Sequence, residues 1–312
     1  MVGFKFSLQR MKKIKSIVTG GAGFIGSNLV DRLVEEGHKV IVLDNFVTGK
    51  RSNLLNHLKK NVQIFKLDIS NAKNLDKYFK GVSYVYHLAG LAEIVPSIKN
   101  PRKYFINNTL GTLNVLEAAK KVKVKKFIYA ASSSCYGSPK KIPTSEIQKI
   151  DTKHPYAFTK FLGEEAVIKY ADFFSMPNIS CRFFNVYGPR LNTTGQYGAV
   201  FSNFLTQKKK KRPLTIVGNG KQTRDFIHVD DLTNAFIKLA RSNLKNKIYN
   251  LGSGKETSIN KIANIIGGKK IFIPKRPGDP NRSCANISKI KKDIKWKPKI
   301  SIIEGIERLF QS

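Results

Sequence analysis

The chain has 312 residues, of which 41% are hydrophobic and 25% charged, the composition of a folded globular protein rather than a disordered or fibrous one. No apolar run approaches the roughly 18 residues of a membrane-spanning helix, and the N-terminus lacks the roughly 7–15-residue apolar core of a signal peptide. The three cysteines and five histidines show no metal-ligand or disulfide spacing, so neither a metal nor a disulfide framework is expected. We therefore expect a cytoplasmic protein without membrane contact, built as one large domain or two closely joined ones.

The charge is strongly positive, with 56 basic and 21 acidic residues giving +35. Such a balance is typical of proteins that bind nucleic acid. However, 44 of the basic residues are Lys and are spread along the chain, apart from a run at 208–212, whereas readers of phosphates and bases use the bidentate fork of Arg. We therefore expect no nucleic-acid partner, and only a general attraction for small polyanions.

Strand-like and helix-like segments alternate along the first part of the chain. Residues 14–19 form a short apolar strand pattern, followed by a Gly-rich turn and by apolar residues at helical spacing over 24–34. Further strand patterns lie at 40–43, 63–67, 82–87, 126–131 and 179–183, and the clearest helical ones at 71–79 and 102–121. This alternation predicts an α/β fold with a doubly wound (Rossmann) parallel sheet.

The character of the sequence changes after about residue 185, where short segments separated by Gly, Pro and Asn take over. We expect residues 14–185 to form the dinucleotide-binding Rossmann domain. Residues 186–312 are expected to form mainly a smaller C-terminal α/β domain that binds the substrate, with some segments returning to the Rossmann sheet. Residues 1–13 have no place in the pattern and are expected to be an N-terminal extension, disordered at its start.

Gly20, Gly23 and Gly26 follow the first strand and open the first helix, where a dinucleotide-binding turn needs them. Glycine at these points permits a tight turn and a close approach of the backbone to a pyrophosphate, while the helix N-terminus supplies partial positive charge. Asp44 ends the next strand about twenty residues on, where a carboxylate accepts from ribose hydroxyls and repels a 2′-phosphate. The pattern predicts NAD rather than NADP; the alternative is that Asp44 only forms a turn with Asn45.

Asp68 follows the third strand pattern and is placed to accept a hydrogen bond from the adenine amino group. The alternative for this residue is a helix N-cap, because Asp is among the favoured capping residues. The sequence alone leaves both open.

Tyr156 and Lys160 lie four residues apart behind Pro155, a spacing that places both side chains on one face of a helix. A free Tyr has a pKa near ~10, so it is a poor base at neutral pH until positive charge stabilises its phenolate. Lys160 and an oxidised nicotinamide would supply that charge. The same spacing recurs at 136–140, where an intervening Gly and Pro break the helical face.

Ser132, Ser133 and Ser134 follow the strand pattern at 126–131, at the end of the sheet where ligands of open α/β folds bind. Their hydroxyls can donate to and accept from a substrate hydroxyl that is losing its proton. The alternative is a Ser-rich loop that caps its own backbone, and both can hold for different serines.

Together these residues resemble the extended short-chain dehydrogenase/reductase family, and within it the nucleotide-sugar 4-epimerases. The resemblance covers the chain from residue 14 onward. The matching segments are TGGAGFIG at 19–26, Asp44-Asn45, HLAG at 87–90, NTLGT at 108–112, SSSCYG at 132–137, YAFTK at 156–160, RFFNVYGPR at 182–190, RDFIHVDD at 224–231 and RPGD at 276–279.

The resemblance implies a role for each residue that matches a family motif. Tyr156 becomes the base, Lys160 its partner and a ribose ligand, and Ser132 the hydroxyl that helps to shuttle the proton. The implied NAD-binding residues are Gly20, Gly23, Phe24, Ile25, Gly26, Asp44, Asn45, Asp68, Ile69, Leu88, Ala89, Tyr156 and Lys160. The implied substrate-binding residues are Ser132, Ser133, Ser134, Asn185, Val200, Arg224, Arg276, Asp279 and Ser283.

Several of these substrate residues have a more specific implied partner. Arg224 and Arg276 would hold the diphosphate, as charge complementarity demands, and Asp279 the nucleoside ribose. Asn185 would contact the sugar-linked phosphate. Ser283, four residues after Asp279, stands where a bulky Tyr would restrict the pocket to plain hexoses, so it implies room for an N-acetyl group at C2.

The activity implied by the resemblance is 4-epimerisation of a UDP-hexose through a 4-keto sugar. The substrates would include UDP-N-acetylglucosamine and UDP-N-acetylgalactosamine, and NAD would be held tightly and not consumed. Family members of this type are commonly homodimers through paired helices, here residues 102–121 and the helix after Pro155.

Two other functions stay open. A related dehydratase, or a uronate epimerase or decarboxylase, would use the same fold. Dehydratases carry acidic residues just before the Tyr-Gly of this motif, where this chain has Ser133, Ser134 and Cys135, and a decarboxylase needs an Arg near Pro96. The second alternative is a non-catalytic, NAD-containing protein with a basic binding surface, against which the presence of both Tyr156 and Lys160 argues.

Overall fold

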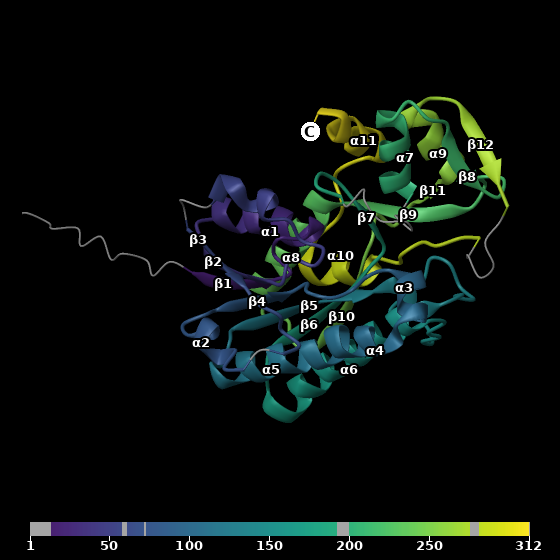
Figure 1. The fold of residues 1–312 in the computed structure, drawn as a ribbon. Helices are drawn as coiled ribbons and strands as arrows, with labels where there is room; N and C mark the ends of the chain where they lie inside the picture. The colour runs from purple at the N-terminus through teal and green to yellow at the C-terminus, as the bar shows by residue number, and fades with distance from the viewer. Residues whose placement is uncertain (1–13, 58–60, 72, 192–199, 275–280, 312) are drawn as a thin grey trace, which may run out of the picture.

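A seven-stranded sheet is the largest element of the computed structural model, which describes residues 14–57, 61–71, 73–191, 200–274 and 281–311 (Figure 1). The strand order is β10-β6-β5-β4-β1-β2-β3, and all neighbouring strands pair in parallel. The strands are β1 (Lys15–Thr19), β2 (Lys39–Asp44), β3 (Val62–Lys66), β4 (Tyr84–His87), β5 (Lys126–Ser132), β6 (Asn178–Phe183) and β10 (Lys247–Leu251). The order reverses between β1 and β4, which opens a crevice beyond the carboxyl ends of these strands. The predicted doubly wound α/β fold is confirmed.

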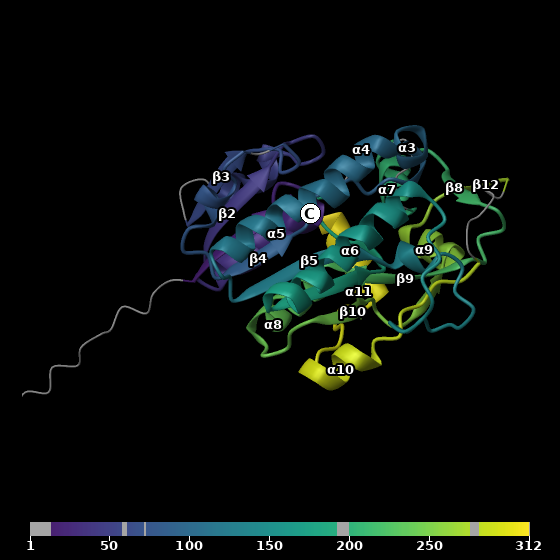
Figure 2. The ribbon, with the colours of Figure 1, turned by 90° about the horizontal axis from the view of Figure 1, so that it is seen from below.

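Helices cover both faces of this sheet (Figures 1 and 2). Alternate strand residues point to opposite faces, so in β1 Val18 belongs to one buried apolar cluster and Ile17 to the other. Because both faces are covered, the strands are nearly continuous apolar runs. One layer contains α1 (Phe24–Glu35), α8 (Val229–Arg241) and α10 (Ser288–Ile294), and the other contains α2 (Asp76–Phe79), α5 (Gly111–Lys121) and α6 (Pro155–Phe174).

The helix predicted over 102–121 is continuous but not uniform. It begins as α4 (Pro101–Tyr104), passes through a π-helical segment η2 (Phe105–Leu110) and ends as α5. π-helical turns inside α-helices occur frequently at functional sites.

The helix predicted over 71–79 is wrong for most of its length, because α2 starts only at Asp76. Asn74 has a φ of 55°, in the left-handed region that a continuing α-helix excludes. Asn tolerates this conformation better than most residues, and here that local preference prevails over the apolar periodicity.

After residue 185 the chain contributes β10, α8 and α10 to the main sheet layers and otherwise forms a smaller lobe. Its two sheets have the orders β11-β9-β7 and β12-β8. A separate apolar cluster that includes Phe201 and Ile262 fills its interior. The lobe contains β7 (Asn185–Tyr187), α7 (Val200–Lys209), β8 (Leu214–Val217), β9 (Thr223–His228), β11 (Glu256–Ser258), α9 (Ile259–Ile266), β12 (Lys270–Ile273) and α11 (Ile302–Gln311).

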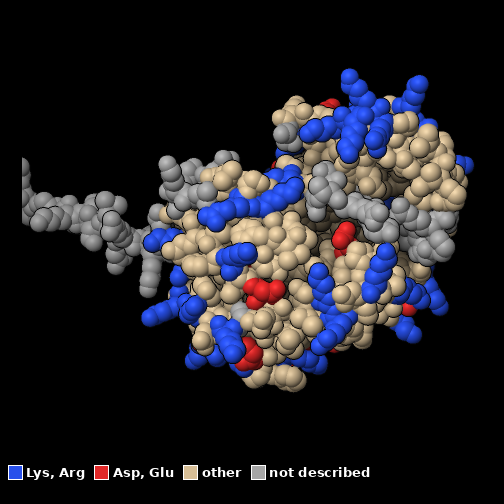
Figure 3. All heavy atoms as spheres, in the orientation of Figure 1, with Lys and Arg blue, Asp and Glu red and all other residues tan. Residues whose placement is uncertain are grey.

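Lys and Arg side chains are spread over both lobes on the face shown in Figure 3. Within the described ranges, no helix has the length and apolar character needed to cross a membrane. The expected extension at residues 1–13 lies outside the described residues.

Candidate functional site

The Gly-rich turn between β1 and α1 has no space for side chains where it doubles back. Gly20 has a φ of +67°, and a Cβ added to Gly26 would lie 2.1 Å from the backbone oxygen of Gly20. A Cβ on Gly23 would meet only that oxygen, at 3.3 Å, and would otherwise project into open space. No side chain caps α1 at Gly23, so the backbone N–H groups of its first turn are left to a ligand.

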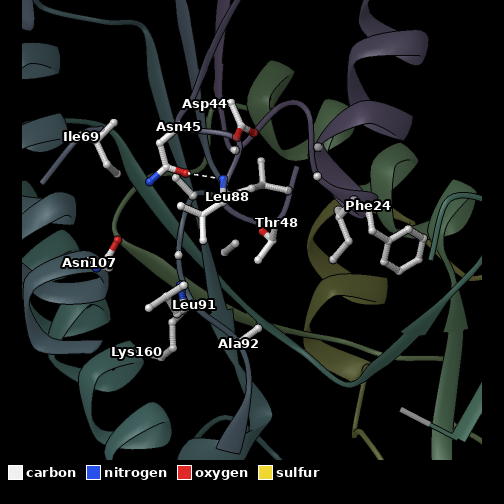
Figure 4. A pocket seen from close by; sticks show the side chains of 18 of the residues that line it. Phe24, Asp44, Asn45, Thr48, Ile69, Leu88, Leu91, Ala92, Asn107 and Lys160 are labelled. Carbon is white, nitrogen blue, oxygen red and sulfur yellow. Dashed lines mark hydrogen bonds between the residues drawn. The ribbon is translucent and has the colours of Figure 1, made fainter. Parts of the chain in front are cut away.

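A cavity of about 400 Å³ begins at this turn and continues along the carboxyl ends of the strands (Figure 4). Asp44 and Asn45 lie at one end of it and Lys160 and Leu91 at the other. Every residue expected to bind NAD lines this cavity, namely Gly20, Gly23, Phe24, Ile25, Gly26, Asp44, Asn45, Asp68, Ile69, Leu88, Ala89, Tyr156 and Lys160.

The carboxylate of Asp44 is fixed by two backbone amides. Ala22 N donates to Oδ2 at 2.9 Å and Phe46 N donates to Oδ1 at 2.8 Å. The bond from Phe46 N closes a turn at Asp44-Asn45, and such a turn was the alternative interpretation of Asp44. Asp44 therefore forms the turn and also lines the cavity. Burial raises the pKa of Asp44, against the effect of the two amides.

Asp68 is not a helix N-cap, because α2 begins eight residues later, at Asp76. Its Oδ1 accepts from both the backbone and the hydroxyl of Ser70, at 2.9 and 2.6 Å, and its Oδ2 accepts from Asn45 Nδ2 at 3.1 Å. Burial alone would raise the pKa of Asp68, but these three hydrogen bonds outweigh it and lower the pKa. An ionised carboxylate therefore stands beside Asn45 at the Asp44 end of the cavity.

Helix α6 carries Tyr156 and Lys160 into the opposite end. His154 caps its N-terminus by accepting from Ala157 N at 3.2 Å, and Pro155 occupies the first turn. The His154 ring stacks on the Tyr156 ring at a centroid distance of 5.9 Å. Burial raises the pKa of Tyr156, while hydrogen bonds with Ser132 and Ser134 act in the opposite direction.

Lys160 is 6% exposed, and its Nζ lies 4.3 Å from the centroid of the Tyr129 ring. Burial lowers the pKa of Lys160 to about 7, with the charge of Glu164 opposing the shift. A buried cation that titrates near neutral pH in the same cavity as the Tyr156 phenol is the arrangement expected of a proton-transfer site.

The three serines form the single-turn 3₁₀-helix η3 (Ser133–Tyr136) and its cap. Ser132 Oγ accepts from Ser134 N at 3.2 Å and lies 2.8 Å from Ser134 Oγ. Because Ser132 and Ser134 also bond with Tyr156, these side chains cap their own backbone and reach the phenol at the same time. Cys135 is buried, and burial raises the pKa of its thiol to about 12, so it carries no reactive thiolate.

Asn108 is a site residue to which the sequence reasoning gave no role, although the segment 108–112 was singled out as a motif. It lies in the π-helical segment η2, and its side chain bonds with Leu91 in the cavity wall and with Thr159 on α6. An added Cβ on Gly90 would lie 3.0 Å from Asn108 Oδ1, so the wall passes close to this side chain. Other cavity-lining residues to which the sequence assigned no role are Tyr104, Asn107 and Glu93, the last an unusual charge in the loop after HLAG.

A buried hydrogen-bond chain runs beneath the cavity wall. Thr19 Oγ1 accepts from Ala89 N at 3.2 Å and bonds with His87 Nδ1 at 2.7 Å. His87 Nε2 bonds with Thr112 Oγ1 at 2.9 Å, and that hydroxyl donates to Asn108 O at 2.6 Å. Burial, followed by the charge of Lys160, lowers the pKa of His87 to about 3, so the imidazole is neutral.

A buried ion pair fixes α6 to the rest of the site. Arg182 and Glu164 are 3% and 1% exposed, and Arg182 Nε donates to Glu164 at 3.0 Å. Arg182 Nη1 also donates to the Tyr136 hydroxyl, at 2.9 Å, at the end of η3. One guanidinium thus ties the helix of Tyr156 to the serine segment.

The residues expected to bind substrate form no single cluster with this cavity. Asn185 on β7 donates to Asp225 O at 3.1 Å, and its strand runs parallel to β9, which carries Arg224. Val200 begins α7, and Ser283 is partly buried. Ser132 and Ser134 reach the cavity through Tyr156. Arg276 and Asp279 lie outside the described residues.

The cavity residues fit a dinucleotide. The bare glycine backbone and the uncapped helix N-terminus suit a pyrophosphate, and Asp44 suits a ribose. None of the described residues form a cluster of His, Cys, Asp or Glu that would hold a metal ion.

Known proteins resemble this chain along nearly its whole length. A putative UDP-glucose 4-epimerase of Methanocaldococcus jannaschii is 37% identical over 302 residues, which cover 94% of this chain and 96% of that protein. UDP-glucuronic acid decarboxylase 1 of Arabidopsis thaliana is 35% identical over 313 residues, covering 96% and 69% respectively.

A solved structure also resembles this chain along nearly its whole length. UDP-N-acetylglucosamine 4-epimerase from Methanobrevibacter ruminantium M1, in complex with UDP-N-acetylmuramic acid, has a TM-score of 0.90 and 33% identity, covering 96% of this chain and 99% of that one. Residues 16–252 match the NAD dependent epimerase/dehydratase family. The chain therefore belongs to this family of nucleotide-sugar epimerases and dehydratases and is an NAD-dependent enzyme.

Proposed function

We propose that the protein catalyses 4-epimerisation of a UDP-hexose through a 4-keto sugar, with Tyr156 as the base, Lys160 as its electrostatic partner and Ser132 as a proton shuttle. The observation that carries the proposal is that Tyr156 and Lys160 line the same cavity as the glycine turn, while Ser132 bonds with Tyr156. The same cavity thus contains residues that fit a dinucleotide and a side chain that can accept and donate a proton.

The proton chemistry follows from the environments of the two side chains. Burial opposes ionisation of Tyr156, so its phenolate needs positive charge close by. Lys160 supplies it whenever its ammonium is protonated, which a pKa of about 7 permits at neutral pH. The Ser132 and Ser134 hydroxyls act on the phenol in the same direction and favour its ionised form further. NAD, when bound, supplies the hydride acceptor and donor for C4 of the sugar and a positive nicotinamide.

The segment before Tyr136 favours an epimerase over a dehydratase or decarboxylase. Loss of water or carbon dioxide requires an acid or base in addition to the Tyr, and Ser133, Ser134 and Cys135 occupy that position. Serine hydroxyls do not ionise near neutral pH, and the thiol of Cys135 has a pKa of about 12. Pro96, on α3 (Ile94–Lys99), offers no cation for a uronate carboxylate.

The proposal extends to N-acetylated sugars through Ser283. This side chain is small and partly buried, and it follows Arg282, whose guanidinium is held by Glu256 at 3.0 Å. A small residue leaves room for a C2 substituent. The UDP diphosphate is assigned to Arg224 by charge complementarity.

We also propose a homodimer through α3, η2 and α6. Large apolar side chains are exposed along these elements, with Ile98 60%, Leu110 45% and Phe158 40% exposed. Phe105 and Phe158 already meet edge to face at 5.8 Å, and a second copy would cover them. Light scattering on the parent and on Phe158→Glu should report a dimer and a monomer. The three cysteines are free and buried, which agrees with a cytoplasmic enzyme.

The direct test is to incubate the purified protein with a panel of UDP-sugars without added cofactor. Conversion of UDP-glucose or UDP-N-acetylglucosamine to its 4-epimer supports the proposal. Release of carbon dioxide from UDP-glucuronic acid, or formation of a 4-keto-6-deoxy sugar, would assign one of the related reactions instead.

A further inference from the structure

Glu93 is a solvent-exposed acidic residue that lines the cavity at the end where Tyr156 lies. It immediately precedes α3 and lines the cavity together with Tyr104 and Tyr156. The other acidic residues that line the cavity, Asp44 and Asp68, lie at the opposite end, where Phe46 N donates to Asp44 and Asn45 Nδ2 donates to Asp68. Neither the expected binding of NAD nor the proposed proton transfer gives Glu93 a role.

Tyr104 links Glu93 to the reactive phenol. Tyr104 is 3% exposed and lines the cavity together with Glu93 and Tyr156. Burial raises the pKa of Tyr104 to about 12, with the charge of Glu93 and then that of Tyr156 contributing. Glu93 and Tyr156 therefore both lie close enough to one buried phenol to act on it.

The charge of Glu93 is not neutralised locally. None of the ion pairs in the described part of the chain includes Glu93. The nearby cation Lys160 is buried and already stabilised by Glu164. A ligand that enters this end of the cavity therefore meets an acidic side chain that no ion pair in the described residues neutralises.

We propose that Glu93 is a specificity residue that restricts this site to nucleotide sugars with an uncharged hexose, by repelling a carboxylate on the ring. The inference rests on the proposed function, because it assumes that the sugar lies beside Tyr156. The hydroxyl of a hydroxymethyl group, or the N–H of an N-acetyl group, can donate a hydrogen bond to the Glu93 carboxylate without charge repulsion. A uronate or a lactyl ether would bring a second carboxylate beside Glu93, and juxtaposed like charges discriminate against such a ligand.

UDP-glucose and UDP-glucuronic acid test this directly, because they differ only in a hydroxymethyl against a carboxylate at C6. Calorimetric titration of the NAD-loaded protein should show UDP-glucose binding at least about tenfold tighter. Glu93→Gln should bring the two dissociation constants within about threefold, mainly by strengthening UDP-glucuronic acid. Glu93→Lys should reverse the preference. Glu307→Gln, which removes an exposed carboxylate on α11, is the matched control and should keep the parent ratio.

Equal affinities in the parent, or a ratio that Glu93→Gln leaves unchanged, would overturn the assignment of Glu93. Because binding is measured separately from turnover, the role of Glu93 and the proposed epimerisation can be refuted independently of each other. If the affinity ratio responds to Glu93 but no UDP-hexose is epimerised, the role of Glu93 stands and the proposed reaction is wrong. If UDP-hexoses are epimerised and the ratio does not respond, the reaction stands and the role of Glu93 is wrong.

Discussion

Two hydrogen bonds join the side chain of Asn108 to the backbone of Leu91: Leu91 N donates to Oδ1 at 2.7 Å, and Nδ2 donates to Leu91 O at 3.0 Å. Nδ2 also donates to Thr159 Oγ1 at 3.1 Å, between Tyr156 and Lys160 on α6. Asn108 therefore sets the spacing between the cavity wall and the helix that carries the proposed base.

We expect Asn108→Ala to lower kcat/KM for the proposed epimerisation by about tenfold to a hundredfold, because small displacements of positioned groups have effects of that size. Far-UV circular dichroism should stay at the parent value. Asn246→Ala, which removes an exposed side chain that bonds with Asp172, is the control. A kcat/KM equal to that of the parent would show that Leu91 holds its place without Asn108.

Tyr156→Phe should reduce kcat by about 10²–10⁴-fold, the usual contribution of a general acid–base group. NAD should remain bound, because only the hydroxyl is lost and the ring still stacks on His154. Tyr170→Phe removes a phenol from the same helix, where it bonds with Glu117, and should leave the rate unchanged. Rates of Tyr156→Phe within a few-fold of the parent would remove Tyr156 from the mechanism.

Lys160 should make the stability of the NAD-free protein depend on pH. Its pKa is about 7 in the folded protein, below its ordinary value near 10.5, so between these values the unfolded chain binds the extra proton. The free energy of unfolding of the parent should therefore rise with pH in this window relative to Lys160→Met, by at most about 1.4 kcal/mol per pH unit. Urea unfolding at pH 7, 8 and 9 measures it. A constant difference would mean that Lys160 keeps its ordinary pKa.

Asp44→Asn should weaken the preference for NAD over NADP by about tenfold or more. The carboxylate is buried and points into the cavity, so a 2′-phosphate beside it suffers charge repulsion that an amide does not produce. The measurement is the ratio of the two dissociation constants. Asp76→Asn, which neutralises an exposed acid on α2, is the control, and an unchanged ratio in Asp44→Asn would place cofactor selection elsewhere.

Ser283→Tyr should abolish turnover of UDP-N-acetylglucosamine by steric exclusion and spare UDP-glucose if that is a substrate. The readout is kcat/KM for both sugars. Ser288→Tyr, at the exposed start of α10, introduces the same ring and should affect neither. Persistence of N-acetyl sugar turnover in Ser283→Tyr would show that the C2 group lies elsewhere.

The parts of the site that could be predicted from the sequence are those that short motifs and strand ends determine. Gly20, Asp44 and Asp68 follow successive strands, and parallel strands bring their carboxyl ends to one edge, so chain order alone places them together. The placement of Tyr156 and Lys160 on one helix face could be predicted from the helical repeat alone.

Other features depend on long-range contacts that leave no local pattern. Glu164 and Arg182 are ordinary charged residues in sequence, and their pairing exists only because α6 packs on β6. The π-helical segment around Asn108 has the periodicity of an ordinary helix, and its contacts with Leu91 and Thr159 span 17 and 51 residues. At Asn74 a single left-handed residue precedes α2, so the helix that apolar spacing had predicted from residue 71 begins only at Asp76.

The bond from Arg182 to both Glu164 and Tyr136 has a consequence for how this scaffold can change. Helix α6, which carries the base, and the 3₁₀-helix η3, which carries the serines, are joined by hydrogen bonds from a single buried guanidinium. The segments carrying Asn185, Arg224 and Ser283 belong to the other lobe or its connections, and none of these three residues bonds with that guanidinium. New sugars can therefore be accommodated by remodelling the second group of segments while the distances that govern proton transfer are inherited intact.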